Sequence, residues 1–247
     1  MKLTAALVGC LLLPASSVSA GEKPPRGVEP ELAVHFDFYV VDGADVSDGS
    51  VHGYTARLTA GEIVPGRKKP AVKFSGDGQL TMTERPQELD PSARALTVGA
   101  MCKPSAPDGV IVSMGDATDG FSLYLQDGVP QFAVRVNGAL HKVAAREPVA
   151  LNEWSHIAGV IGPKGELSVL VNTSPVGMSQ GSLMAHTPTE PLSVGADPRS
   201  QVGDYSGPLH WRGLLQEVRL YWGALSRENN RELLGDWADR PGCGCHK

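Results

Sequence analysis

The feature that most constrains this chain is a series of short segments in which apolar and polar residues alternate. In the first of them Val34, Phe36 and Phe38 alternate with His35 and Asp37. A period of two places successive side chains on opposite faces, so it predicts a strand with one buried face. Comparable apolar segments follow at Val72–Phe74, Leu80–Met82, Leu96–Ala100, Val110–Val112, Phe121–Leu125, Phe132–Val136, Ile157–Ile161, Leu167–Val171, Leu192–Val194 and Leu214–Tyr221.

Turn-forming residues separate these segments. Asn137-Gly138 suits a two-residue hairpin turn, and Gly162-Pro163-Lys164-Gly165 stands between two further strands. Gly (29) and Pro (19) make up about 19% of the 247 residues, against roughly 12% in an average soluble protein, which argues against a helical bundle. About a dozen short strands without intervening helices predict an all-β fold of two packed antiparallel sheets, and they exclude a parallel nucleotide-binding fold.

One helical pattern follows the last strand, over Ser226–Trp237. Ser226 can cap the first turn, and Leu233, Leu234 and Trp237 lie on one stripe. We expect this short C-terminal helix to pack its stripe on the edge of the sandwich.

The charge balance narrows the class of partner. The chain has 22 Lys and Arg against 27 Asp and Glu, a formal net charge of -5, with no basic block to neutralise phosphates. Proteins that bind nucleic acid neutralise phosphates with clustered cations and stack bases on aromatic side chains, which here make up only 6% of residues. We therefore expect no nucleic-acid partner.

The first twenty residues have the pattern of a cleaved signal peptide. Lys2 precedes an apolar run from Leu3 to Leu13, and Val18-Ser19-Ala20 offers small residues to a signal peptidase. An apolar run of this length spans about 16 Å as a helix, roughly half a bilayer core, so no transmembrane segment is expected. The prediction is a secreted or periplasmic protein with a signal peptide at 1–20, a linker at 21–31, one domain at 32–237 and a Cys-containing tail at 238–247.

Three cysteines remain after removal of the signal peptide: Cys102, Cys243 and Cys245. An odd number cannot all pair within one chain. Either Cys102 bridges to one tail cysteine, or Cys243 and Cys245 form a small ring, and the sequence leaves both possibilities open.

Five phrases in order resemble the laminin-G-like, concanavalin A-like jelly roll found in many secreted bacterial proteins. They are Val46-Ser47-Asp48-Gly49-Ser50, Val72-Lys73-Phe74-Ser75-Gly76, Asn152-Glu153-Trp154-Ser155-His156-Ile157-Ala158, the hairpin at 165–172, and Trp211-Arg212-Gly213-Leu214-Leu215-Gln216-Glu217-Val218-Arg219-Leu220-Tyr221. The resemblance covers about residues 32–234. It implies a two-sheet antiparallel jelly-roll sandwich. Asn172-Thr173 stands where the family has Asp-Gly, and Gln216 stands where it has Asp.

The resemblance also implies a structural calcium ion, held by the early loop and the last strand. It nominates Asp48 and Glu217 as ligands, with backbone carbonyls completing the shell. Asp42, Asp45 and Asp48 sit three residues apart in one loop, and oxygen-rich loops suit a hard divalent cation. The alternative is turn chemistry, because Asp side chains also bond nearby backbone amides in loops.

Sugar binding requires an exposed aromatic face with polar groups beside it. The loop from Gln201 to His210 has that composition, and we predict Tyr205 as the aromatic contact with Asp204 and His210 as hydroxyl partners. Trp154, Trp211 and Trp222 are expected in the core or at sheet edges.

Catalytic patterns are weak. Glu88-Leu89-Asp90 approaches the glucanase "E-x-D-x-x-E" pattern, but Ala93 occupies the third acidic position. Gly177-Met178-Ser179-Gln180-Gly181 fits "G-x-S-x-G", a motif that requires a strand-to-helix turn. We therefore predict an exported, non-catalytic binding module that recognises a glycan or an extracellular protein surface through its loops. The alternatives are a glycoside hydrolase with an unplaced acid pair, and a structural or interaction module of a cell-surface assembly.

Overall fold

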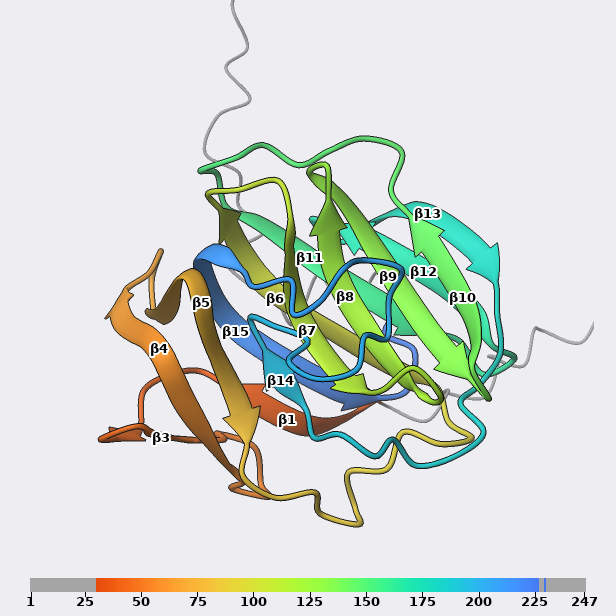
Figure 1. Ribbon diagram of the computed structural model, residues 1–247, viewed down its shortest axis with the longest axis horizontal. Coiled ribbons are helices and arrows are strands. Elements are labelled where there is room, and N and C mark those ends of the chain that lie inside the picture. Colours follow the sequence, from red (N-terminus) through yellow and green to blue (C-terminus); the bar gives the residue numbers. More distant parts are fainter. Residues whose placement is uncertain (1–29, 227–228, 230–247) are drawn as a thin grey trace, which may run out of the picture.

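The computed structural model describes residues 30–226 and residue 229, and these residues form a two-layered β-sandwich (Figure 1). Its strands are β1 (Glu31–Phe36), β2 (Val41–Asp42), β3 (Asp45–Ser47), β4 (Thr55–Pro65), β5 (Pro70–Met82), β6 (Leu96–Pro104), β7 (Gly109–Gly115), β8 (Gly120–Gln126), β9 (Val129–Val136), β10 (Ala139–Ala144), β11 (Ser155–Ile161), β12 (Glu166–Val171), β13 (Ser174–Gln180), β14 (Ser193–Val194) and β15 (Arg212–Trp222). The described strand pairs are antiparallel, as the alternating pattern predicted.

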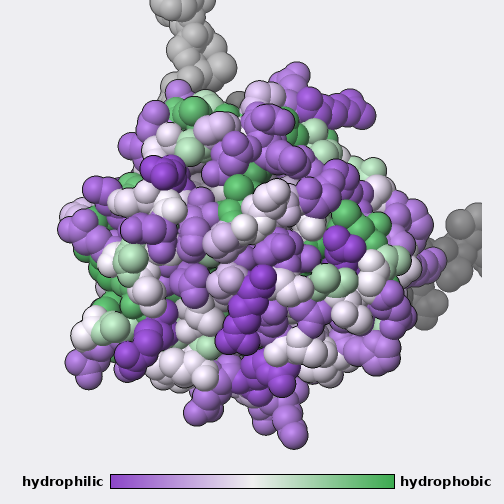
Figure 2. All heavy atoms as spheres, in the orientation of Figure 1, coloured by the Kyte–Doolittle hydropathy of each residue, from purple (hydrophilic) through white to green (hydrophobic). Residues whose placement is uncertain are grey.

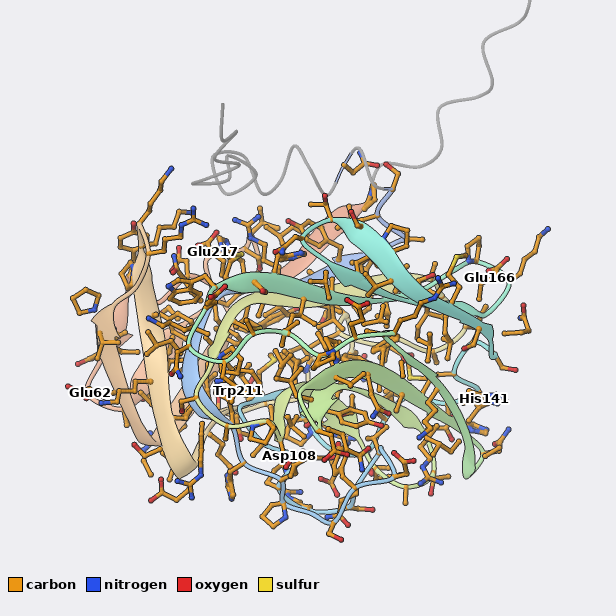
Figure 3. The ribbon with its side chains drawn as sticks, turned by 90° about the horizontal axis from the view of Figure 1, so that it is seen from above. Glu62, Asp108, His141, Glu166, Trp211 and Glu217 are labelled. Atoms are coloured by element: carbon orange, nitrogen blue, oxygen red, sulfur yellow. The ribbon has the colours of Figure 1, made fainter. Side chains whose placement is uncertain are left out.

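Two sheets form the layers. The front sheet runs β10-β9-β8-β7-β14, and the back sheet runs β15-β6-β11-β12-β13, with β1 paired to β15. β5 joins them, because its first half pairs with β15 and its second half with β14. Figure 3 shows the two layers edge-on. β10 and β13 contact each other at the edge of the sandwich opposite to β5.

The core fills the space between the sheets. Phe121, Leu123 and Leu125 of β8 point into it, as their alternation predicted, and Trp211 is buried in the same cluster. Gly159 of β11 shows how closely the layers approach, since a Cβ atom there would lie 2.2 Å from the ring of Phe132 in the opposite sheet. Any larger residue at position 159 would displace the ring of Phe132.

The predicted hairpins form. Asn137 and Gly138 join β9 to β10 with φ angles of +50° and +81°, which only a few residue types adopt readily. Asn172 and Thr173 join β12 to β13 with φ angles of +48° and +69°, so this turn keeps the left-handed geometry although the expected glycine is replaced by threonine.

Sequence patterns described one edge of the sandwich incompletely. The segment at Gly76-Asp77-Gly78 does not separate two strands, because β5 continues through it. β4, whose sequence lacks a clear alternation, pairs along β5 with a register shift between Thr59 and Gly61. A Cβ atom at Gly78 would lie 2.2 Å from the carbonyl oxygen of Ala60, so the close approach at this bulge explains the glycine.

The predicted terminal elements fall largely outside the described residues. This applies to the signal peptide, most of the linker, the tail, and the Ser226–Trp237 helix beyond its start. At that start the backbone N–H of Asn229 donates to the Ser226 hydroxyl at 3.1 Å, the contact expected of a capping serine. Within residues 30–226, no helix is long and apolar enough to span a membrane.

Candidate binding surface

The loop between β14 and β15, which contains the predicted sugar-binding residues, lies against the outer face of the front sheet (Figure 1). Tyr205 is only 9% exposed, and its ring packs edge-on against Tyr124 of β8 with centroids 4.7 Å apart. Its hydroxyl donates to Asp197 at 2.6 Å and accepts from Ser122 at 2.7 Å. The prediction of Tyr205 as an exposed aromatic contact is therefore wrong, because the loop turns this ring into the protein.

Asp204 and His210 do not share a site with an exposed ring. Asp204 accepts hydrogen bonds from Lys142 at 2.5 Å and from the Tyr124 hydroxyl at 2.9 Å. Burial alone would raise the pKa of Asp204, but these two donors outweigh it and lower the pKa. His210 lies elsewhere, with Nδ1 3.2 Å from the carbonyl oxygen of Gly78 in β5. These polar groups hold the loop in place.

The outward surface of the front layer is mainly hydrophilic. Figure 2 shows hydrophobic side chains there only as small separate groups. Arg135 of β9 contributes to fixing the loop on this face, since its Nε donates to the carbonyl oxygen of Val202 at 2.8 Å.

The proposed calcium ligand Asp48 organises a turn. Its carboxylate accepts from the backbone N–H groups of His35 at 2.6 Å and Ser50 at 3.0 Å, and from the Ser50 hydroxyl. Asp48 is buried, so these donors satisfy a carboxylate that water cannot reach.

Glu217 is surrounded by nitrogen atoms rather than oxygen ligands. Lys69 Nζ lies 2.9 Å away, His35 Nε2 lies 3.3 Å away, and Arg219 donates to the same carboxylate. Burial alone would raise the pKa of Glu217, but His35, Arg219 and Lys69 outweigh it and lower the pKa to about 2. Asp48 and Glu217 therefore do not fit a calcium ion, and among the described residues no group of three or more His, Cys, Asp or Glu side chains could hold a metal.

Cys102 is a free, buried thiol on the core side of β6. Burial raises its pKa well above the ordinary value, so the thiolate is disfavoured. Its proposed partners Cys243 and Cys245 lie outside the described residues.

The weak catalytic patterns have structural roles. Asp90 accepts from the backbone N–H of Ser92 in its own loop and from the hydroxyl of Thr187 in the loop between β13 and β14. Ser179 lies within strand β13, where its hydroxyl donates to the carbonyl oxygen of Lys142 at 3.0 Å. The "G-x-S-x-G" segment is thus a strand and not a strand-to-helix turn.

A groove of about 610 Å³ lies where β5, β15 and β6 run side by side. Lys73, Lys103 and Arg212 line it, together with the polar side chains of Ser75, Ser105 and Asn152. Lys73 and Lys103 both face Leu214 across the strands, and their neighbours Val72, Leu215 and Cys102 are in the core. By alternation, the lysines point outward.

An adjoining groove of about 600 Å³ lies at the β4–β5 turn and shares Val64 with the first. Tyr39 lines it and is 61% exposed, so this ring is open to solvent. Arg67, Lys68 and Lys69 form the other polar part of its wall. We call the two grooves together the basic surface. Sequence reasoning missed it because its residues come from five separate segments, although the run Arg67-Lys68-Lys69 was a visible signal.

These features define a class of protein: a jelly-roll sandwich of two antiparallel sheets with grooves on its surface. Residues 74–229 match the model of the concanavalin A-like lectin/glucanases superfamily, and the chain belongs to this family. A search of curated protein sequences gave no match.

Solved structures share the fold. Domain 4 of AbnA, an extracellular GH43 arabinanase from Geobacillus stearothermophilus, solved with arabinotriose, has a TM-score of 0.65 and 18% identity, over 84% of this chain and 100% of that one. The binding domain of Paraclostridial Mosquitocidal Protein 1 has a TM-score of 0.64 and 14% identity, over 84% of this chain and 52% of that one. The binding domain of botulinum neurotoxin DC with SialylT has a TM-score of 0.62 and 10% identity. The match covers 82% of this chain and 50% of the neurotoxin chain. At these identities the likeness concerns the fold.

Proposed function

We propose that this domain is an exported, non-catalytic glycan-binding module that contacts its ligand through the basic surface. The observation that carries the proposal is the exposed ring of Tyr39 beside two grooves lined with hydrogen-bonding side chains. An aromatic face packs on the C–H groups of a sugar ring, while amide, hydroxyl and cationic groups bond its hydroxyls. The sheets fix the positions of these side chains, so little ordering is needed on binding.

Three of the neighbouring folds support a binding role by analogy. The arabinanase domain was solved with arabinotriose, and the other two structures are binding domains, one of them in complex with SialylT. Fold likeness does not fix a ligand, so the residues of this chain must support the choice.

The absence of catalysis is also part of the proposal. A glycoside hydrolase needs a carboxylic acid that can donate a proton and a second carboxylate facing it. Glu217 is held ionised by three basic side chains, and Asp90 is committed to hydrogen bonds from Ser92 and Thr187. Neither side chain is suited to general acid catalysis.

A glycan array probed with the protein tests the proposal. We expect retention of a defined group of glycans, loss of retention in Tyr39→Ala, and near-normal retention in Tyr39→Phe, which keeps the ring. Tyr39 is largely exposed, so the melting temperature should change little. Equal binding by wild type and Tyr39→Ala would show that Tyr39 is not the contact, and release of reducing ends from polysaccharides would favour a hydrolase.

A structural or interaction module is the second candidate. A groove of about 710 Å³ between β10 and β13 is lined by Val149, Val171, Pro175, Val176 and Met178, among others. Met178 is 73% exposed, so it adds an accessible apolar side chain to this groove. If the array shows no glycan retention, a protein ligand at this groove becomes the better explanation.

A further inference from the structure

We infer that the ligand of the basic surface is an acidic oligosaccharide, bearing carboxylate or sulfate groups. This inference rests on the proposed function and adds the chemical class of the glycan. The residues that carry it are Lys73, Lys103 and Arg212, which come from three neighbouring strands.

The two lysines flank one row of the sheet. Leu214 of β15 pairs with Lys73 of β5 on one side and with Lys103 of β6 on the other. Neighbouring strands lie about 4.8 Å apart, so the two lysine Cα atoms are separated by roughly 10 Å. An extended ligand lying across the strands would meet one cation on each side of Leu214. Repeated negative charges along a sugar chain suit this arrangement better than a single anion.

Arg212 is placed by the backbone of β5. Gly76 has a φ of +100°, and a Cβ atom there would lie 2.4 Å from Nε of Arg212. The guanidinium group therefore rests over Gly76, beside Ser75, which pairs with Arg212 across the strands. A planar guanidinium can bond a carboxylate or sulfate through two parallel N–H groups, and a fixed position reduces the entropy lost on binding.

The cations of the groove form no ion pair within the described residues. Within residues 30–226, no acidic side chain lies within ion-pair distance of Lys73, Lys103 or Arg212. Glu62 of β4 pairs in register with Lys73, but it forms no ion pair with it. By contrast, Glu217 pairs with Lys69 of the β4–β5 turn and with Arg219 of β15.

The arrangement is notable because the chain as a whole is acidic, with a formal net charge of -5. A concavity lined by one sign of charge focuses the field and raises the local concentration of an oppositely charged ligand. Ser75, Ser105 and Asn152 add groups that can bond sugar hydroxyls between the charges. A neutral glycan would use these polar groups and leave the three cations without a partner.

Direct binding measurements with four hexasaccharides test the inference: oligogalacturonate, a heparin-derived hexasaccharide, maltohexaose and arabinohexaose. We expect at least one acidic probe to bind about tenfold more tightly than either neutral probe, a difference of roughly 1.4 kcal/mol. Its affinity should fall as salt rises, because exposed charges are screened.

Single substitutions locate the site. Lys73→Ala, Lys103→Ala and Arg212→Ala should each weaken binding of the acidic probe about threefold to tenfold, as expected for a lost charge-assisted hydrogen bond. Arg212→Lys keeps the charge but loses the planar group, so its effect should be intermediate. Lys164→Ala is the matched control, since it removes a lysine from the β11–β12 turn, next to Glu166 at the opposite end of the molecule (Figure 3).

The outcomes separate this inference from the proposed function. Tight binding of a neutral probe that is insensitive to salt and to the three substitutions would overturn the acidic specificity while leaving a glycan-binding module. If Lys164→Ala weakened binding of an acidic probe as much as the three groove substitutions do, the binding would be a nonspecific charge effect. That result would overturn the proposed site. Failure of all four probes, together with an empty glycan array, would overturn both.

Discussion

The hydroxyl of Tyr205 donates a 2.6 Å hydrogen bond to Asp197, a carboxylate with no solvent exposure. Burial raises the pKa of Asp197 above its ordinary value despite this bond and the one from the N–H of Val202. The pair therefore anchors the β14–β15 loop, and Tyr205 acts on the fold rather than on a ligand.

Removing this hydroxyl should destabilise the protein. Tyr205→Phe leaves Asp197 without one of its donors, and a buried polar group that loses a partner costs about 1–3 kcal/mol. Chemical denaturation should show this loss with unchanged affinity for any ligand of the basic surface. A variant of normal stability that no longer binds ligand would instead return Tyr205 to the binding site.

Calcium should not stabilise the protein through Asp48 and Glu217. Both carboxylates already have hydrogen-bond donors or cations around them, so an ion would have to displace those partners. A ligand that binds only the folded state raises the melting temperature by mass action. We expect equal melting temperatures in millimolar calcium and in chelator. A clear rise in calcium that disappears in Glu217→Gln would contradict this interpretation.

His156 should make the fold sensitive to mild acid. Burial, with a smaller contribution from the charge of Arg219, lowers the pKa of His156 from 6.5 to about 4. Above pH 6.5 the ring is neutral in both the folded and the unfolded chain, so the protein then has its full free energy of unfolding as far as His156 is concerned. As pH falls from 6.5 towards 4, the unfolded chain takes up a proton that the folded protein refuses, and about 3 kcal/mol is lost.

Denaturation curves measured across this pH range check the expectation. His156→Gln cannot titrate, so its stability should depend less steeply on pH between these values than that of the wild type. Identical slopes for wild type and His156→Gln would show that His156 does not carry the effect.

The sequence predicts the fold well because alternation and turn chemistry are local. The alternating residues of β8 and the Asn137-Gly138 turn could be placed without knowing what lies opposite them. The register shift between β4 and β5 could not be predicted, since it depends on the approach of Gly78 to Ala60 on the neighbouring strand.

The site was harder to predict for the same reason. The segment around Tyr205 has the composition of a binding loop. Whether its ring points outward, however, depends on contacts with Asp197 in the same loop and with Ser122 on strand β8. Alternation places the ring of Tyr39 outward, because it follows the buried Phe38, but it does not show that this ring stands beside a groove. The three groove cations lie far apart in the sequence, and only the pairing of β5 with β15 and β15 with β6 brings them together.

The position of Arg212 provides the last prediction. Gly76→Ala places a methyl group where the Arg212 guanidinium now lies, and it adds strain because φ is +100°. Gly43→Ala is the matched control: its φ is +62°, also left-handed, but no atom lies within 4 Å of the added carbon. Both variants should lose about 1 kcal/mol of stability from backbone strain. Only Gly76→Ala should also weaken binding of an acidic oligosaccharide, measured by titration calorimetry, because the guanidinium must move. Equal affinities in the two variants would mean that the placement of Arg212 over Gly76 does not contribute to recognition.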